Sequence, residues 1–91
     1  YTELERVVLF LQENNTIKIE IAAHTNGWLS HSQSMQLSKQ RAQAIAHYLT
    51  NHGIADNRIS YKGYGKIKPL ASNDTVEGRR KNQRIEMKII E

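Results

Sequence analysis

The residues best suited to bind a ligand lie between Ile17 and Leu49, where an alternating apolar stretch leads through a polar loop into a helical pattern. The loop starts with His24, Thr25 and Asn26, and Arg41 lies on the helical segment, in what the pattern predicts to be its first turns. A strand end and a helix start both present unpaired backbone groups, so a polar loop between them forms a natural pocket. The sequence therefore predicts a binding site here.

Catalysis and metal binding have little support in the same residues. Ser32, Ser34 and Ser38 lie near His31, but neither a nucleophile elbow nor a matched acid–base pair is recognisable. The histidines fit no standard zinc spacing: they are His24, His31, His47 and His52. We therefore expect a protein that is not an enzyme and that uses no metal and no cofactor.

Composition indicates one small globular domain. The 91 residues are 38% hydrophobic and 24% charged, which is compatible with an ordered core, and they include no cysteine for a disulfide. No apolar run approaches the roughly 18 residues of a transmembrane helix. Because the chain begins inside a helical pattern, we expect residues 1–91 to be one domain of a longer protein.

The net charge of +4 favours anionic partners weakly. The most basic cluster is Arg79, Arg80, Lys81 and Arg84. It could bind nucleic acid, but no stacking aromatic residues interleave it, and such a run is more often a solvated face. We therefore expect no nucleic-acid partner.

The hydrophobic pattern predicts the elements that hold the polar loop. Residues 1–14 form an amphipathic helix with Thr2 as a possible cap, and residues 17–21 alternate as a strand. Ser38 occupies a possible N-cap position for the second helix, which runs to Leu49, and Gly53 ends it.

The C-terminal half adds two strands and a short helix. Residues 58–64 form a strand, residues 75–82 a short helix or turn, and residues 85–90 a final strand. Gly63 and Gly65 indicate sharp turning of the backbone. A helix between two strands implies a parallel crossover, so we predict an α/β (α+β) two-layer sandwich, with a small mixed sheet and helices packed on one face.

A longer series of residues now resembles a known family. The pattern is His24-Thr25-Asn26, Leu37-Ser38-x-x-Arg41-Ala42, Tyr48-Leu49, Gly53-Ile54, Arg58, Gly63-Tyr64-Gly65, Pro69, Asn73, Thr75, Gly78-Arg79, Asn82 and Arg84-Ile85-Glu86. In order and spacing, from about residue 17 to the end, it resembles the C-terminal peptidoglycan-binding domain of the OmpA family, which Pal lipoproteins and MotB-type stator proteins share. In that family a further strand precedes the first helix, and the present chain lacks it.

The resemblance implies non-covalent binding of peptidoglycan through its stem peptide at diaminopimelate. In the family an aspartate after the His-Thr pair and an arginine of the helix grip the zwitterionic end of the diamino acid; Asn26 and Arg41 stand at these positions. A carboxylate would pair with the ligand's ammonium group, and a guanidinium would bind its carboxylate as a bidentate fork. The ligand-binding residues that we expect are Thr25, Asn26, Trp28, Ser34, Leu37, Arg41, Asn82 and Arg84, the last two as supporting residues.

The chain departs from the family pattern at four positions. Asn26 replaces the aspartate, and Leu29, Ser34 and Gln83 replace a frequent glycine, a frequent asparagine and an arginine. Charge-assisted hydrogen bonds contribute about 1.5–3 kcal/mol against about 1 for neutral ones, so Asn26 would weaken binding by about 1 kcal/mol, roughly tenfold.

Several of these residues could have a purely structural role and make no contact with a ligand. Asn26 and Thr25 could simply shape the loop, Arg41 could be a solvated helix residue, and Trp28 could be either a lid over a ligand or a packed side chain.

The leading prediction is an anchor that ties an outer-membrane or periplasmic protein to the cell wall from the periplasmic face of the outer membrane. The alternative is a degenerate member of the same fold that binds a protein partner in an envelope complex. The changed loop and Trp28 favour this alternative, and nucleic-acid binding rests on charge alone.

Overall fold

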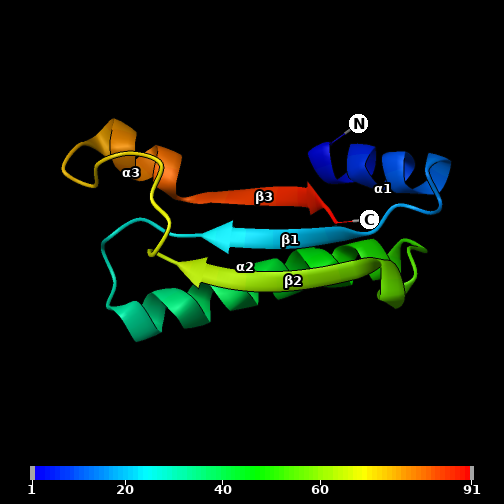
Figure 1. Ribbon diagram of the computed structural model, residues 1–91, viewed down its shortest axis with the longest axis horizontal. Coiled ribbons are helices and arrows are strands. Elements are labelled where there is room, and N and C mark those ends of the chain that lie inside the picture. Colours follow the sequence, from blue (N-terminus) through cyan, green and yellow to red (C-terminus); the bar gives the residue numbers. More distant parts are fainter. Residues whose placement is uncertain (1, 91) are drawn as a thin grey trace.

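A computed structural model describes residues 2–90 and shows three strands and three α-helices in one small unit. In chain order the elements are α1 (Glu3–Glu13), β1 (Ile19–His24), α2 (His31–Asn51), a 3₁₀ turn (Asp56–Arg58), β2 (Ile59–Gly65), α3 (Val76–Asn82) and β3 (Arg84–Ile89). The sheet order is β2-β1-β3, with β1 parallel to β2 and antiparallel to β3 (Figure 1). The parallel crossover through α2 and the mixed sheet that the sequence predicts are therefore confirmed.

The core lies between the sheet and the helices α1 and α2. Alternation along β1 turns Ile19, Ile21 and Ala23 toward the helix layer, where they meet Leu11 of α1 and Leu49 of α2. None of the helices described in residues 2–90 covers the opposite face of the sheet, and α3 lies beyond the end of the sheet (Figure 1). The two-layer prediction holds for α1 and α2, whereas α3 instead packs near the loops.

Helix α1 is held at both ends by side chains. Thr2 accepts a hydrogen bond from the Glu5 backbone N–H and so caps the helix, as the sequence predicts. At the other end Arg58 donates to the backbone carbonyls of Leu11 and Asn14 at 2.8 Å each. Arg58 is wrongly included in the predicted strand: it lies in the 3₁₀ turn before β2, and its guanidinium group satisfies carbonyl groups at the end of α1.

Helix α2 begins eight residues earlier than the prediction that places Ser38 at its N-cap. Ser30 is the N-cap, and its hydroxyl and the Gln33 side chain form a reciprocal capping box. Ser38 is fully buried inside the helix, where its hydroxyl donates to the Met35 carbonyl and accepts from the Gly65 N–H at 2.9 Å. Residues 31–36 are therefore helix and not loop, because the signal Ser-x-x-Gln lies at residues 30–33.

Two glycines fix α2 in place. Gly53 has a φ of +93° and ends α2, and the Ile54 N–H bonds to the Leu49 carbonyl across the turn, as the sequence predicts for a glycine terminator. Gly63 serves close packing and not the turning predicted for it, since a Cβ atom there would lie 2.3 Å from the Lys39 backbone nitrogen. The backbone turn occurs at Gly65, whose φ is +57°.

Candidate ligand-binding site

The loop after β1 is fixed by its own polar side chains. The Thr25 N–H donates to the Gly65 carbonyl at 2.8 Å, which continues the pairing of β1 with β2. The Asn26 side chain accepts from the Trp28 N–H at 3.1 Å and donates to the Gln83 side chain at 3.0 Å. Asn26 therefore shapes the loop and also ties it to the segment between α3 and β3.

Asn82 organises the loop that follows β2. It is 1% exposed, and its carbonyl oxygen accepts from the N–H groups of Leu70 and Ala71 at 2.7 and 3.0 Å. Its amide nitrogen donates to the Ala71 carbonyl and to the Asn73 side chain, both at 2.8 Å. All four bonding capacities of the amide are thus used inside the protein, which suits a supporting residue.

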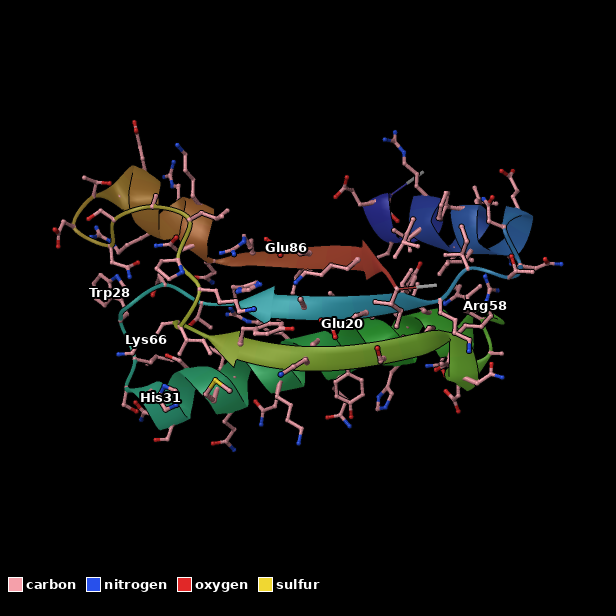
Figure 2. The ribbon with its side chains drawn as sticks, in the orientation of Figure 1. Glu20, Trp28, His31, Arg58, Lys66 and Glu86 are labelled. Atoms are coloured by element: carbon pink, nitrogen blue, oxygen red, sulfur yellow. The ribbon has the colours of Figure 1, made fainter. Side chains whose placement is uncertain are left out.

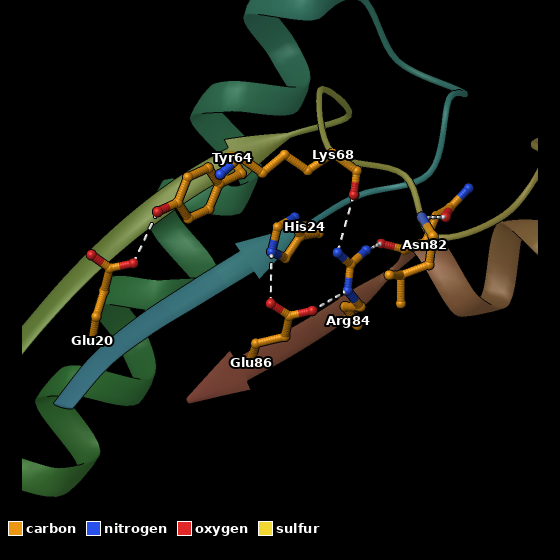
Figure 3. Close-up of polar contacts among 8 residues, drawn as sticks. Glu20, His24, Tyr64, Lys68, Asn82, Arg84 and Glu86 are labelled. Atoms are coloured by element: carbon orange, nitrogen blue, oxygen red, sulfur yellow. Dashed lines mark hydrogen bonds and ion pairs between the residues drawn. The ribbon is translucent and has the colours of Figure 1, made fainter. Parts of the chain in front are cut away.

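Arg84 is bound to the protein through all three of its guanidinium nitrogens. It donates to Glu86 at 2.7 Å, to the Asn82 carbonyl at 3.2 Å and to the Lys68 carbonyl at 3.0 Å (Figure 3). The hydrogen bond from Arg84 lowers the pKa of the Glu86 carboxyl group. This geometry makes Arg84 a brace between β3 and the preceding loop.

His24 lies on the helix-free face of the sheet, between Tyr64 and Glu86. Its ring stacks on Tyr64 with centroids 5.1 Å apart, and its Nε2 atom lies 3.5 Å from a Glu86 oxygen (Figure 3). The side chain is 2% exposed, and neither ring nitrogen has a hydrogen-bond partner among residues 2–90. Burial and the positive charge of Arg84 lower the pKa of His24.

A shallow depression of about 430 Å³ opens beside Asn26. It is lined by Asn26, Val76, Arg79, Arg80 and Gln83. The volume falls in the range of roughly 300–1,000 Å³ that is usual for small-ligand sites. Its lining offers amide groups and guanidinium groups, which together suit a polar or anionic ligand.

The same end of the molecule exposes an aromatic side chain. Trp28 is 74% exposed, so it is not a packed core residue, and the Arg79 guanidinium lies 5.7 Å from its ring centroid. Figure 2 shows Trp28 at the loop end of the molecule, on the side where α3 lies. Arg79 is in turn fixed by a hydrogen bond to the Asn73 carbonyl at 2.8 Å.

Arg41 lies deeper in α2 than the sequence predicts. It is the eleventh residue of the helix and not part of the first turns, because the helix begins at His31. Yet α2 runs back along the sheet, and Ser38 bonds to Gly65, the partner of His24 in the sheet. One helical turn beyond Ser38, Arg41 therefore still lies close to the C-terminal end of β1.

Helical spacing indicates which flank of α2 Arg41 occupies. Arg41 precedes Ile45 by four residues, and Ile45 lines an apolar groove of about 550 Å³ together with Ile85 of β3. Gln83, the partner of Asn26, is the C-cap of α3 and precedes Ile85 by two residues, just before β3 begins at Arg84. The structure thus places Asn26 beside the start of β3, and Arg41 on the helix that packs against the sheet.

The Arg41 side chain is half-buried and makes no hydrogen bond or ion pair within residues 2–90. Arg58, Arg79 and Arg84, by contrast, all donate to acceptors of the protein. The guanidinium group of Arg41 is thus available to a ligand.

The remaining predicted site residues are Ser34, Leu37 and Thr25. Ser34 is fully buried, and its hydroxyl approaches the Leu29 carbonyl at 3.5 Å. Leu37 is half-buried one turn before Arg41, on the same flank of α2. Thr25 is 5% exposed, and its hydroxyl has no partner among the described residues.

Contacts bring Asn26 and Trp28 together with α3, and Asn82 together with Arg84. The contacts of Gln83 and Asn73 could not be predicted from the sequence, since contacts between distant loops leave no local pattern. Within residues 2–90 no group of three or more His, Asp or Glu side chains could hold a metal ion. None of the described helices is both long and apolar enough to cross a membrane.

Comparison with known proteins decides the family. The sequence model of the OmpA family matches residues 1–83. The chain belongs to the OmpA family. It is 44% identical over 61 residues to outer membrane protein A of Bordetella avium, an alignment that covers 67% of this chain and 31% of that protein. It is 38% identical over 87 residues to the peptidoglycan-binding protein ArfA of Mycobacterium tuberculosis, covering 96% of this chain and 27% of that protein.

The fold of this OmpA-family chain also matches a solved structure. The C-terminal domain of Helicobacter pylori MotB superposes with a TM-score of 0.87 at 27% identity, covering 97% of this chain and 69% of that one. The α+β fold expected from the sequence is therefore confirmed. The chain spans about three tenths of the length of the two curated relatives.

Proposed function

We propose that this OmpA-family domain binds cell-wall peptidoglycan without covalent chemistry and recognises the diaminopimelate of the stem peptide. The observation that carries the proposal is the half-buried Arg41, whose guanidinium group has no acceptor among residues 2–90. A bidentate fork to the carboxylate at the far end of diaminopimelate would satisfy it. Membership of a family that includes a peptidoglycan-binding protein supports the same ligand.

The ammonium group of the diamino acid needs an acceptor next to that carboxylate. We assign this role to Asn26, which follows β1 and whose oxygen already accepts one bond from the Trp28 N–H. A carbonyl oxygen has a second lone pair, so it can accept from the ligand while the loop keeps its shape. Asn82 and Arg84 then act as supports, because their hydrogen bonds are used to hold the loops.

The role that follows is mechanical and not enzymatic. A domain that holds the stem peptide ties the protein of which it is part to the cell wall, and we place this contact at the periplasmic face of the outer membrane. The names of relatives from the outer membrane support this location.

Co-sedimentation with purified sacculi tests the proposal. The wild-type protein is expected in the pellet, and Arg41→Ala in the supernatant. Lys39→Ala is a matched control, because Lys39 is an exposed cation on the same helix, two residues away on a different flank. Wild-type protein that stays in the supernatant would instead favour binding of a protein partner, and equal pelleting of the wild type and Arg41→Ala would reject the site.

A further inference from the structure

Trp28 is the most exposed large hydrophobic side chain among the described residues, at 74% exposure. Leaving an aromatic ring in water forgoes the free energy that its burial would release. Its position is nevertheless defined: its backbone N–H donates to Asn26, and Arg79 lies over its ring. An exposed ring that is held in place on a binding loop requires a functional explanation.

Only one face of the Trp28 ring has a cationic neighbour in the structure. Arg79 lies 5.7 Å from the ring centroid and is anchored to the Asn73 carbonyl, so it supports the indole from one side. With most of the side chain exposed, the other face is open to a flat ligand. This arrangement is that of a stacking platform.

The surroundings of Trp28 indicate the class of ligand. The polar depression of about 430 Å³ shares Arg79 with the Trp28 platform and is lined also by the amides of Asn26 and Gln83. Hydrogen-bonding groups beside an aromatic face fit a pyranose ring, whose C–H face packs on the electron-rich ring while its hydroxyl and N-acetyl groups bond to amides and guanidinium groups. A simple aliphatic ligand would leave these polar groups unpaired.

We propose that Trp28 stacks against an amino-sugar ring of the peptidoglycan glycan strand, next to the stem peptide at Arg41. This inference rests on the proposed function and extends it from the peptide to the sugar. It predicts that the site binds a sugar-bearing stem peptide more tightly than the free peptide.

The test is calorimetric titration of two probes, the diaminopimelate-containing tripeptide and the same tripeptide attached to its disaccharide. For the wild type we expect the disaccharide form to bind about five- to tenfold more tightly, which corresponds to roughly 1–1.4 kcal/mol. Trp28→Ala should bind both probes with the wild-type affinity for the tripeptide. Leu70→Ala, which removes another exposed apolar side chain outside the depression, should keep the wild-type preference.

Fluorescence gives a second readout, because Trp28 is the sole tryptophan of the chain. Its emission should shift to shorter wavelength with the disaccharide probe and stay unchanged with the tripeptide. Equal affinity of the wild type for both probes, or an unchanged preference in Trp28→Ala, would overturn the platform while leaving the peptide site intact.

Failure of the proposed function has a different signature. If the wild type does not bind the tripeptide, the proposed Arg41 site is wrong. Titration with a peptide-free N-acetylglucosamine tetrasaccharide then tests the Trp28 stacking platform independently of the peptide site. Saturable binding of this oligosaccharide by the wild type, lost in Trp28→Ala, would support the platform. No binding would overturn it.

Discussion

Asn26 carries two roles that are chemically separable. Its oxygen fixes the turn through the Trp28 N–H, and its amide nitrogen ties the loop to Gln83. The structure therefore supports the loop-shaping interpretation of Asn26, and the second lone pair of the oxygen leaves the ligand interpretation open as well.

Substitution Asn26→Asp tests the second role. An aspartate can still accept from the Trp28 N–H, and Gln83 can rotate its amide group to donate to the new carboxylate. We expect about tenfold tighter binding of the diaminopimelate tripeptide, from the gain of a charge-assisted bond to its ammonium group. Titration calorimetry measures this change, and an unchanged or weaker affinity would show that the asparagine serves a different ligand.

His24 makes folding stability depend on pH. Burial and Arg84 place the pKa of His24 below its ordinary value of 6.5, with Lys88 and Lys68 acting in the same direction and Glu86 against it. Because the unfolded chain then binds the proton more readily, stability is complete above pH 6.5 and falls as the pH drops toward the folded-state pKa. The pKa of Glu86 is itself lowered from 4.5, so its contribution is lost only at more acidic pH.

Thermal unfolding at pH 7.5 and pH 5.5 measures the effect of His24. The wild type should lose stability between these values, and His24→Phe, which keeps an aromatic ring against Tyr64, should lose less. His31→Phe is a control at an exposed histidine on α2. Equal pH dependence of the wild type and His24→Phe would show that protonation of His24 is not the cause.

At the scale of elements, the packing of α2 against β2 determines where the site residues lie. Gly63 allows the α2 backbone to approach the strand, since an added Cβ atom would meet the Lys39 nitrogen at 2.3 Å and the Ser38 hydroxyl at 2.5 Å. Backbone atoms cannot move aside as a flexible side chain can. The position of Arg41 relative to the sheet thus depends on this glycine.

Gly63→Ala is expected to destabilise the protein by about 1–3 kcal/mol through overpacking. For a domain of this size, each 1 kcal/mol lowers the melting temperature by about 4–8 °C. Thermal unfolding followed by circular dichroism measures the shift, with Ser60→Ala on the exposed side of the same strand as the control. A melting temperature equal to that of the wild type would contradict the close approach of α2 to β2.

The elements were largely predictable because their signals are local. Alternation at Ile19 and Ile21, the helical spacing in α1 and α2, and the glycine at 53 each act over a few residues. The start of α2 was misplaced, although the capping pair Ser30 and Gln33 gives a local signal for it.

The arrangement of the site was only partly predictable. The pairing of Asn26 with Gln83 joins residues 57 positions apart, and Arg58 reaches the Leu11 carbonyl over 47 positions. Such contacts depend on how the loops pack in three dimensions, so the hydrophobic periodicity of the sequence does not predict them. The resemblance to a family predicts which residues belong to the site, but the hydrogen bonds that hold them come from the structure.

At the scale of the whole molecule, the two faces of the sheet differ in what they carry. The helix side contains the core, and Arg41 belongs to α2 in this layer. The other face is polar, with three lysines, Lys62, Lys68 and Lys88, within 4.5–5.3 Å of the centre of the Tyr64 ring. Because the binding loops rest on the ends of strands and α2, the rigid layers fix the geometry of the proposed site.

An apolar groove borders β3, which forms one edge of the sheet in residues 2–90. It lies between β3 and α1 and is lined mainly by aliphatic side chains, including Leu4, Val7 and Met87. Its lining lacks the clustered amide and guanidinium groups found at Asn26. The polar depression beside Asn26 therefore remains the better candidate for a polar ligand.

The central claim is that the Arg41 guanidinium group binds the carboxylate at the far end of diaminopimelate. The most direct test compares two tripeptides, one with diaminopimelate and one with lysine, which lacks only that carboxylate. The wild type should bind the diaminopimelate tripeptide about ten- to hundredfold more tightly, as expected for a charge-assisted bidentate contact. Arg41→Ala should bind both tripeptides equally. A preference for diaminopimelate that persists in Arg41→Ala would contradict the account.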